Sequence, residues 1–270
     1  MNKIKEIIKY SYLLLILVLS YIPLFTMAIF SFNKTSDKGY VSFVWNGFSW
    51  DSYRNLFSSK IMLSLLNSII VASLTALLVV TISLLTVFSL WRQKNKLLKS
   101  INSINNNISM INPDIIIGVS LALFFGIVFG SLSSGKEGLM RTVLGHTVMT
   151  LPYGILIMYP KSEKFNRSLF EASWDLGYSK IKTWFKTYFI YMFSSIIFTI
   201  IITFIFSFDD FIITSITSNT TTIGTELYQG QFRSWALALG TLILLIMIVT
   251  NIIFFIHVKK KTKGKIWKKL

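Results

Sequence analysis

Six long apolar runs, separated by short polar and basic segments, constrain the fold of this chain more than any other feature. They cover, in approximate numbers, residues 10–32, 61–91, 108–130, 139–159, 187–217 and 233–258. A stretch of about 20 apolar residues is long enough to cross a bilayer as a helix. Hydrophobic residues make up 53% of the 270 residues, beyond the share of an ordinary soluble domain. The sequence therefore predicts an all-α membrane protein with six transmembrane helices in a single domain, residues 1–270.

The first run predicts a retained span and not a cleaved signal peptide. Three lysines precede it, at positions 3, 5 and 9. A signal peptide would have an apolar core of about 7–15 residues, followed by a small-residue cleavage site. The run is longer than that, and Ser20-Tyr21-Ile22-Pro23 does not supply such a site. We therefore expect residues 10–32 to be the first span.

The positions of the 27 Lys and Arg residues predict the orientation of the spans. Twenty of them lie in four segments that six crossings would place on one side: residues 1–9, 92–107, 161–186 and 259–269. The remaining seven lie in the alternate segments: Lys34, Lys38, Arg54, Lys60, Lys136, Arg141 and Arg233. Basic loops stay in the cytoplasm, so both termini and residues 161–186 are predicted to be cytoplasmic. The net charge of +16 is thus explained by topology and does not indicate nucleic-acid binding.

Two residues predict helix ends next to the apolar runs. Asp114 follows Pro113 and is typical of a first helical turn, here at the cytoplasmic start of the third span. Pro160 predicts the end of the fourth span, which also contains the helix-perturbing Pro152.

Residues 161–186 form a polar segment whose pattern predicts a folded helix between two spans. Apolar residues recur there at spacings of four, three and four, on one helix face: Phe165, Leu169, Ala172 and Leu176. Gly177 then ends or bends the helix, and a second basic segment follows. With Glu171 and Asp175 at its rim, such a face suits insertion into a groove of a partner protein. An amphipathic helix lying on lipid fits the same residues equally well.

The stretch Glu171 to Gly177, E-A-S-x-x-x-G, resembles the E-A-A-x-x-x-G signature of permease subunits of ABC importers. In that family the signature lies on a cytoplasmic coupling helix that docks into a cleft of the ATP-binding subunit. The resemblance implies that this coupling role falls to Glu171, Ala172, Ser173, Asp175 and Gly177. Two positions depart from the family pattern: Ser173 replaces an alanine, and Thr187-Tyr188-Phe189-Ile190 stands where apolar-x-Leu-Pro normally follows.

The similarity covers nearly the whole chain and points to the PotC-like permeases of spermidine/putrescine importers. Five further segments fall where that family has similar residues: Ser31-Phe32-Asn33, Trp45-Asn46-Gly47-Phe48, Asn112-Pro113-Asp114, Gly145-His146 with Leu151-Pro152, and Phe208-Asp209-Asp210. The resemblance implies a MetI-like, type I permease in a bacterial cell membrane. Its implied partners are a second homologous permease, a homodimeric ATP-binding subunit and an extracellular substrate-binding protein.

Other readings of the same sequence remain open. An ABC permease for another substrate, such as iron or thiamine, would carry the same coupling signature. A cation channel or secondary transporter is a different class, disfavoured by that signature and by the absence of an internal inverted repeat. The sequence leaves open which polyamine is preferred and the exact stoichiometry. It also does not decide whether residues 33–60, a polar and aromatic segment at the outer interface, contact the binding protein.

Two adjacent carboxylates in the fifth run, Asp209 and Asp210, are the strongest candidates for the substrate path, because ionisable residues within spans are costly. On one helix continuing to residue 217, a polar face would contain Thr203, Ser207, Asp210, Thr214 and Thr217. We therefore expect Asp210 on the wall of a polyamine passage and Asp209 against a neighbouring helix or the partner permease. A structural role for both, as helix caps or as partners of Arg141 or Arg233, fits equally well.

The sequence contains no motif for enzymatic chemistry. It has no cysteine, no phosphate-binding Gly-rich loop, no Ser/His/Asp arrangement and no metal-spaced cluster. His146 has no second metal ligand at useful spacing, so we expect it to form interhelical hydrogen bonds. The chain is therefore expected to be a transport subunit without a bound cofactor or metal, with ATP and Mg²⁺ held by the partner ATPase.

Overall fold

The computed structural model describes residues 2–36, 38–93, 95, 97, 112–131, 135–228 and 232–267. These residues form helices and two isolated β-bridges, and no longer strand is present among them. Four of the described helices are long and apolar enough to cross a membrane: Ser59–Arg92, Glu137–Glu163, Lys180–Asp209 and Ser234–Ile253. The prediction of an all-α membrane protein is therefore confirmed. Shorter apolar helices, Leu14–Phe30 and Asp114–Phe129, occupy the places of the first and third predicted spans.

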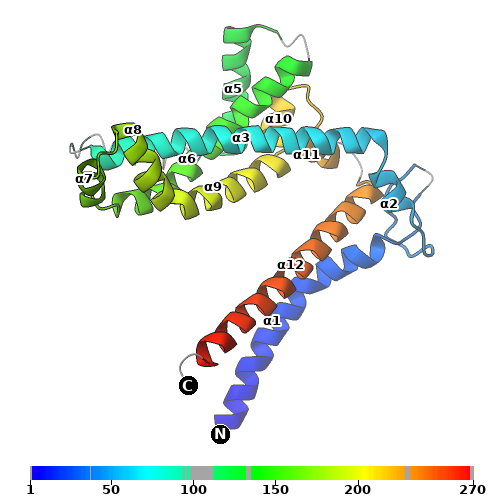
Figure 1. Ribbon diagram of the computed structural model, residues 1–270. Coiled ribbons are helices and arrows are strands. Elements are labelled where there is room, and N and C mark those ends of the chain that lie inside the picture. Colours follow the sequence, from blue (N-terminus) through cyan, green and yellow to red (C-terminus); the bar gives the residue numbers. More distant parts are fainter. Residues whose placement is uncertain are drawn as a thin grey trace. The chain divides into compact units, whose positions relative to one another are not determined.

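The chain divides into two compact units, residues 1–62 with 229–270 and residues 63–228, so the single-domain organisation stays a prediction. In the first unit α1 (Asn2–Phe30) packs against α12 (Ser234–Trp267), and the short α2 (Asp51–Leu56) also packs on α12. The start of α1 and the end of α12 lie at the same end of this pair (Figure 1). A Cβ atom on Gly240 of α12 would lie 2.8 Å from the sulfur of Met27, so these helices approach closely there.

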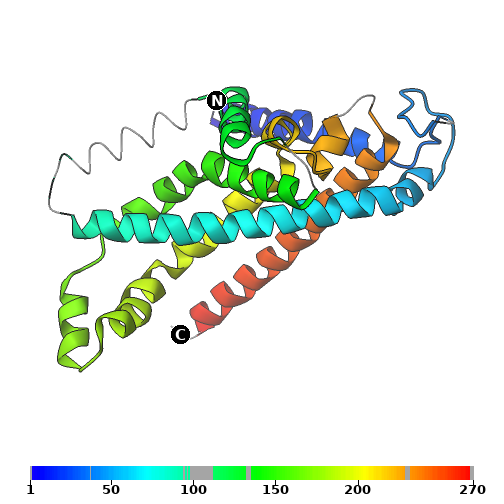
Figure 2. The same ribbon diagram turned by 90° about the horizontal axis from the view of Figure 1, so that it is seen from above.

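The second unit contains most of α3 (Ser59–Arg92) and the helices that follow it up to residue 228. They are α5 (Asp114–Phe129), α6 (Gly135–Glu163), α7 (Ser168–Asp175), α8 (Lys180–Thr183), α9 (Ile190–Asp209), α10 (Ile212–Thr217) and α11 (Ile223–Tyr228). Helix α6 packs along α9, and α10 lies beside both α5 and α6 (Figures 1 and 2). Glycines on α6 permit close packing against α10 and α3. A Cβ on Gly145 would lie 2.7 Å from Ile213 of α10, and one on Gly154 would lie 2.5 Å from Ser83 of α3.

Two predicted helix ends are wrong. Pro160 lies inside α6, which continues to Glu163. The Ser162 hydroxyl donates to the Val87 carbonyl at 3.0 Å and lies 2.6 Å from the Tyr188 hydroxyl, so tertiary contacts hold the last turn despite the proline. The fifth helix does not run on to residue 217, because α9 ends at Asp209 and Asp210 is extended, with φ −63° and ψ 131°.

The junction between residues 161–186, the candidate coupling segment, and α9 is continuous. A π-helical segment, Trp184–Phe189, joins α8 to α9 without a break. The family pattern has a proline here, whereas this chain has Thr187-Tyr188-Phe189-Ile190, which removes no backbone donor. A π-helical turn accommodates an additional residue, and it directs Tyr188 into the core. Residues 108–111 of the third predicted span, and most of the basic 92–107 segment, lie outside the described residues.

Candidate coupling segment and carboxylate pocket

Helix α7 carries the coupling signature and ends in a complete Schellman motif. Gly177 has a φ of +77°. Its N–H donates to the Trp174 carbonyl at 2.8 Å, and the Tyr178 N–H donates to the Ser173 carbonyl at 3.1 Å. Both bonds satisfy carbonyls that a helix end leaves without partners. The prediction that Gly177 ends the helix is therefore confirmed, and the reason is backbone geometry.

The side chains of the predicted apolar face divide between core and surface. Leu169, Ala172 and Leu176 are exposed on α7, with Leu176 at 73%. Phe165 precedes α7 and is only 3% exposed, so its predicted place on the docking face is wrong. The spacing of four that joined it to Leu169 assumes a continuous helix, but α6 ends at Glu163 and α7 begins at Ser168. The exposed part of α7 is thus a short apolar ridge beside Glu171.

Beneath α7, an aromatic cluster fixes the helix to the long helices of its unit. The Phe165 ring lies 5.5 Å from Phe170, 5.3 Å from Trp91 and 5.2 Å from Tyr188, measured between ring centroids. The Trp91 indole also donates to the Phe165 carbonyl at 3.0 Å. Because these rings come from α3, α7, the π-helical segment and the connection before α7, a displacement of α7 must displace the ends of α3 and α9 as well.

Ser173 occupies a buried position in which a small side chain is required. It is 5% exposed, and its hydroxyl donates to the Leu169 carbonyl at 2.8 Å. The hydroxyl is therefore satisfied within the helix, and the departure from the family's alanine leaves no buried polar atom unpaired.

A pocket of about 590 Å³ lies at the base of the coupling segment. Its lining combines aromatic rings with basic groups and one carboxylate: Phe88, Trp91, Arg92, Arg167, Phe170, Glu171, Trp174, Lys180, Ile181 and Trp184. Glu171 and Asp175 are both exposed. Glu171 is thus the acidic member of a rim that is otherwise basic and aromatic.

Substituting Gly177 is expected to weaken the end of α7 through the backbone alone. No heavy atom lies within 4 Å of an ideal Cβ at this position, so space is not limiting. Alanine in the left-handed region costs about 1–2 kcal/mol, and asparagine costs less. Gly177→Ala should therefore increase hydrogen exchange at Tyr178 about tenfold or more, and Gly177→Asn should cause a smaller increase. Equal exchange in both variants would contradict the backbone explanation.

The Asp210 carboxylate forms the cap of α10. It accepts hydrogen bonds from the Ile213 N–H at 3.3 Å, the Thr214 N–H at 3.0 Å and the Thr214 hydroxyl at 3.1 Å. These bonds satisfy the first free N–H groups of a new helix, which explains why α9 stops before this residue. In addition, a Cβ on Gly224 of α11 would lie 2.3 Å from the Asp210 carbonyl, so α11 covers the break closely.

His146 of α6 binds the same carboxylate and completes a buried polar network. Its Nε2 atom lies 2.9 Å from both Asp210 Oδ2 and Thr214 Oγ1, and its Nδ1 atom lies 2.7 Å from Ser207 Oγ. His146 is fully buried and Asp210 is 9% exposed. The predicted interhelical role of His146 is confirmed, since it joins α6 to α9 and α10.

Next to this network lies a pocket of about 510 Å³ with three carboxylates and several aromatic rings in its lining. The lining residues are Asp114, Met149, Tyr153, Ile205, Phe206, Asp209, Asp210, Phe211, Ile212 and Tyr228. Asp114 and Asp209 are exposed, while Asp210 is buried. The result is a cavity with negative charge on its wall and π faces around it. Such a wall can hold an organic cation by ion pairing and by cation–π contact.

The five residues predicted for the substrate path occupy different places. Asp209 and Asp210 both line the pocket, and Ser207 and Thr214 lie behind it in the histidine network. Thr203 is 1% exposed, and its hydroxyl has no hydrogen-bond partner among the described residues. The alternative in which Arg141 pairs with the Asp pair does not apply, because Arg141 binds Glu137 and the Gly130 carbonyl.

No protein-family model matches the chain. A spermidine/putrescine transport system permease protein PotC homolog of Mycoplasma pneumoniae is 33% identical over 274 residues, covering 98% of this chain and 95% of the relative. The PotC homolog of Mycoplasma genitalium is 35% identical over 254 residues, covering 91% and 89%. This chain belongs to the PotC permease family. It is therefore a membrane-embedded transport subunit of an ABC importer, as the resemblance of its sequence implied.

The fold of this PotC-family permease is shared with a distantly related importer. The crystal structure of a bacterial ABC transporter involved in the import of the acidic polysaccharide alginate matches with a TM-score of 0.64. The match covers 96% of both chains at 13% sequence identity. At that identity the likeness concerns the fold and not the cargo.

Two features of this PotC-family permease were missed by the sequence reasoning. Asp114 was placed at the cytoplasmic start of a span, apart from the Asp pair, yet it lines the same pocket as Asp209. The sequence did contain one indication of a shared site, because Asp114 and Asp209 both belong to segments that resemble the PotC-like permeases. The aromatic rings around the pocket gave no signal, because Phe and Tyr are abundant throughout the apolar runs.

Proposed function

We propose that this chain is one of two permease subunits that together form the transmembrane path of a polyamine importer. Six spans, with both termini in the cytoplasm, agree with the distribution of the 27 basic residues. The common end of α1 and α12 in their unit supports the same topology (Figure 1). The partners are a second permease, a pair of ATP-binding subunits and an external binding protein.

We propose that the coupling segment binds the ATPase. The exposed ridge of Leu169, Ala172 and Leu176, with Glu171 beside it, has an apolar face and an acidic rim of the kind that inserts into a partner's groove. Closure of the ATPase pair on binding ATP would pull α7. The aromatic cluster around Phe165 would pass that movement to α3 and α9, and hydrolysis would reset the bundle.

The carboxylate pocket is the observation that supports polyamines as the substrate class. Spermidine and putrescine are flexible chains with several positive charges and methylene segments between them. Asp114, Asp209 and Asp210 supply the counter-charges, and aromatic residues such as Tyr153 and Phe211 supply faces for the ammonium groups and methylenes. The relatives named as spermidine/putrescine permeases support the same class.

Within this pocket the two adjacent carboxylates have different parts in the proposal. Asp210 is fixed by His146 and α10, so it contributes a charge at a constant position in the wall. Asp209 is exposed, and we assign to it the direct ion pair with the passing ammonium group. Ser207 and Thr214 hold the network, and Thr203 extends the polar lining along α9.

Uptake by the complete importer in proteoliposomes tests the function. Labelled spermidine should enter in an ATP-dependent manner, and excess putrescine should compete with it. Asp209→Asn is expected to raise the KM for spermidine about tenfold, the effect of losing about 1.4 kcal/mol, with the same amount of assembled complex. Glu163→Gln, which removes an exposed carboxylate from the end of α6, is the matched control and should leave the KM unchanged.

Three results would contradict the proposal in different ways. Uptake of neither polyamine, with uptake of iron or thiamine, would reject the substrate class. Normal low-concentration uptake by Asp210→Asn but not by Asp209→Asn would remove Asp210 from the passage. ATP-independent cation flux would indicate a channel.

A further inference from the structure

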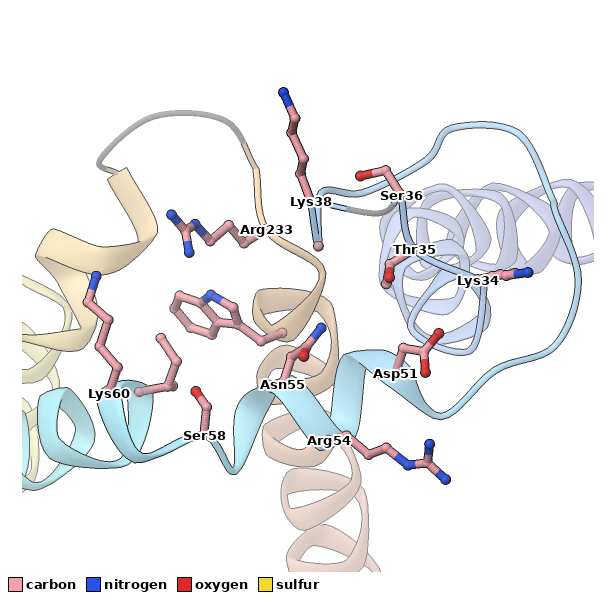
Figure 3. A pocket seen from close by; sticks show the side chains of 13 residues that line it. Lys34, Thr35, Ser36, Lys38, Asp51, Arg54, Asn55, Ser58, Lys60 and Arg233 are labelled. Atoms are coloured by element: carbon pink, nitrogen blue, oxygen red, sulfur yellow. The ribbon is translucent and has the colours of Figure 1, made fainter.

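A third pocket, built entirely from the first unit, has a strongly basic lining. It has a volume of about 530 Å³ and lies among the loop after α1, helix α2, the first residues of α3 and the start of α12. Figure 3 shows its side chains, with Lys60 and Arg233 on one side of the view and Lys34, Thr35 and Ser36 on the other. Five lining residues are Lys or Arg: Lys34, Lys38, Arg54, Lys60 and Arg233. Asp51 is the acidic residue in the lining.

Most basic residues of the chain lie in segments that we predict to be cytoplasmic, but these five lie in segments predicted for the opposite side. Seven basic residues fall in the segments that our topology places outside the cell, and five of them line this one pocket. Lys34, Lys38, Arg54 and Arg233 are exposed, and within the described residues none of the four forms an ion pair. Asp37, next to Lys38 in the chain, lies outside the described residues. Lys34, Lys38, Arg54 and Arg233 therefore give this pocket a net positive lining, although Asp51 also belongs to it.

The loop after α1, which carries Lys34 and Lys38, is held by hydrogen bonds and ring stacking within the loop. Asn33 donates to the carbonyls of Ser42 and Val44, at 3.2 and 2.7 Å, and accepts from the Asn46 N–H at 2.8 Å. The Phe32 ring stacks on Phe48, with 5.5 Å between their centroids. These contacts order the backbone that carries Lys34 and Lys38, which lowers the entropic cost of binding a partner there.

One buried donor in the pocket lining lacks an acceptor. Trp235 lines the pocket and is 3% exposed, and its indole Nε1 has no hydrogen-bond partner among the described residues. The indole N–H can only donate. A buried donor without a partner is costly, and the described residues do not offset that cost.

The cargo itself does not suit this pocket, because a polyamine would be repelled by it. We propose that the pocket receives an acidic surface of the external binding protein, at the carboxylates that border its polyamine site. This inference rests on the proposed function, since a protein that carries a polycation needs carboxylates where it holds its cargo. Once docked, the Lys and Arg groups compete with the cargo's ammonium groups for those carboxylates and weaken the hold on the polyamine.

Charge reversal at the pocket tests this docking. We would reconstitute the complete importer in nanodiscs of zwitterionic lipid and measure the Kd of its polyamine-loaded binding protein. Lys38→Glu with Arg233→Glu should raise the Kd at least tenfold at low salt and flatten its salt dependence. Release of labelled spermidine from the docked protein should also slow. The matched control, Lys38→Arg with Arg233→Lys, keeps both charges and should behave like the parent.

The outcomes separate this inference from the proposed function. An unchanged Kd and an unchanged salt slope in the reversed variant would overturn the docking, while polyamine uptake would still stand. A binding protein that does not bind spermidine or putrescine by calorimetry would instead reject the proposed function. A reversed variant that loses affinity only for anionic vesicles would assign the pocket to lipid and overturn the inference. Basal ATPase activity, equal in all variants, verifies that each complex is folded.

Discussion

His146→Leu is expected to destabilise the permease more than any other single substitution in the polar interior of the second unit. The change removes the ring that binds Asp210, Ser207 and Thr214, and it leaves a buried carboxylate without its hydrogen-bond partner on α6. Leaving a buried polar group without its hydrogen-bond partner costs about 1–3 kcal/mol, and more when the group is charged. We expect a lower melting temperature for the purified importer complex, measured by intrinsic fluorescence during heating.

A double variant separates the pair interaction from simple loss of packing. In His146→Leu with Asp210→Asn, the remaining side chain is neutral and still accepts bonds from α10, so part of the lost stability should return. Thr199→Val is the matched control, because the Thr199 hydroxyl is buried on α9 without a partner among the described residues. That variant should match or exceed the parent in stability. A His146→Leu complex that melts no earlier than Thr199→Val would contradict the network's role.

The same variants distinguish the two functions considered for Asp210. If Asp210 also acts on the passing cation, Asp210→Asn should raise the KM for spermidine in addition to lowering the melting temperature. If it acts only as a cap and histidine partner, the melting temperature should fall and the KM of the surviving complex should stay constant. Measuring the KM for spermidine and the melting temperature on one preparation therefore distinguishes the two functions.

Phe165→Ala and Glu171→Lys are expected to damage coupling by two separable routes. Phe165 is 3% exposed in the aromatic cluster, and truncating a buried phenylalanine costs about 3–5 kcal/mol. This variant should melt earlier and should consume ATP with less transport. Glu171 is exposed, so Glu171→Lys should leave the melting temperature of the isolated permease unchanged.

The separating measurement is co-purification of the ATPase. A lysine in place of the rim carboxylate reverses its charge, so Glu171→Lys should lose the ATPase during affinity purification. Phe165→Ala should retain much of it, because the exposed ridge of α7 is unaltered. Glu163→Lys, a charge reversal at another exposed carboxylate near the end of α6, is the control for charge alone. A stoichiometric complex that survives in Glu171→Lys would exclude α7 as the gripping element.

The sequence predicted the class of protein and the places of its helices because both depend on local patterns. Apolar runs of spanning length, the uneven distribution of basic residues and the E-A-S-x-x-x-G stretch can all be read without knowing which segments touch. The Gly177 helix end and the interhelical role of His146 were predictable for the same reason. A glycine after a helical pattern commonly ends the helix in the left-handed conformation. A histidine within an apolar run commonly forms hydrogen bonds between helices.

The errors arose where tertiary contacts overrode the local pattern. Pro160 predicted an end that the contacts of Ser162 removed. The periodicity through Asp210 predicted one helix, but the carboxylate instead capped a second one. Phe165 had the right spacing for the exposed face of α7 but belonged to the aromatic cluster.

The sequence by itself determined that this chain is a membrane-embedded permease with an E-A-S-x-x-x-G stretch between two apolar runs and an unusual pair of carboxylates. Only the tertiary structure decided what lies beside them. Asp114 lines one pocket with Asp209, and His146 reaches Asp210, although these residues are far apart in the chain. Lys34, Lys38, Arg54 and Lys60 likewise line one pocket with the distant Trp235. The physical reason is that spacing along a helix fixes a residue's neighbours only within a few turns. Helix packing and loop hydrogen bonds determine which distant charges share a cavity.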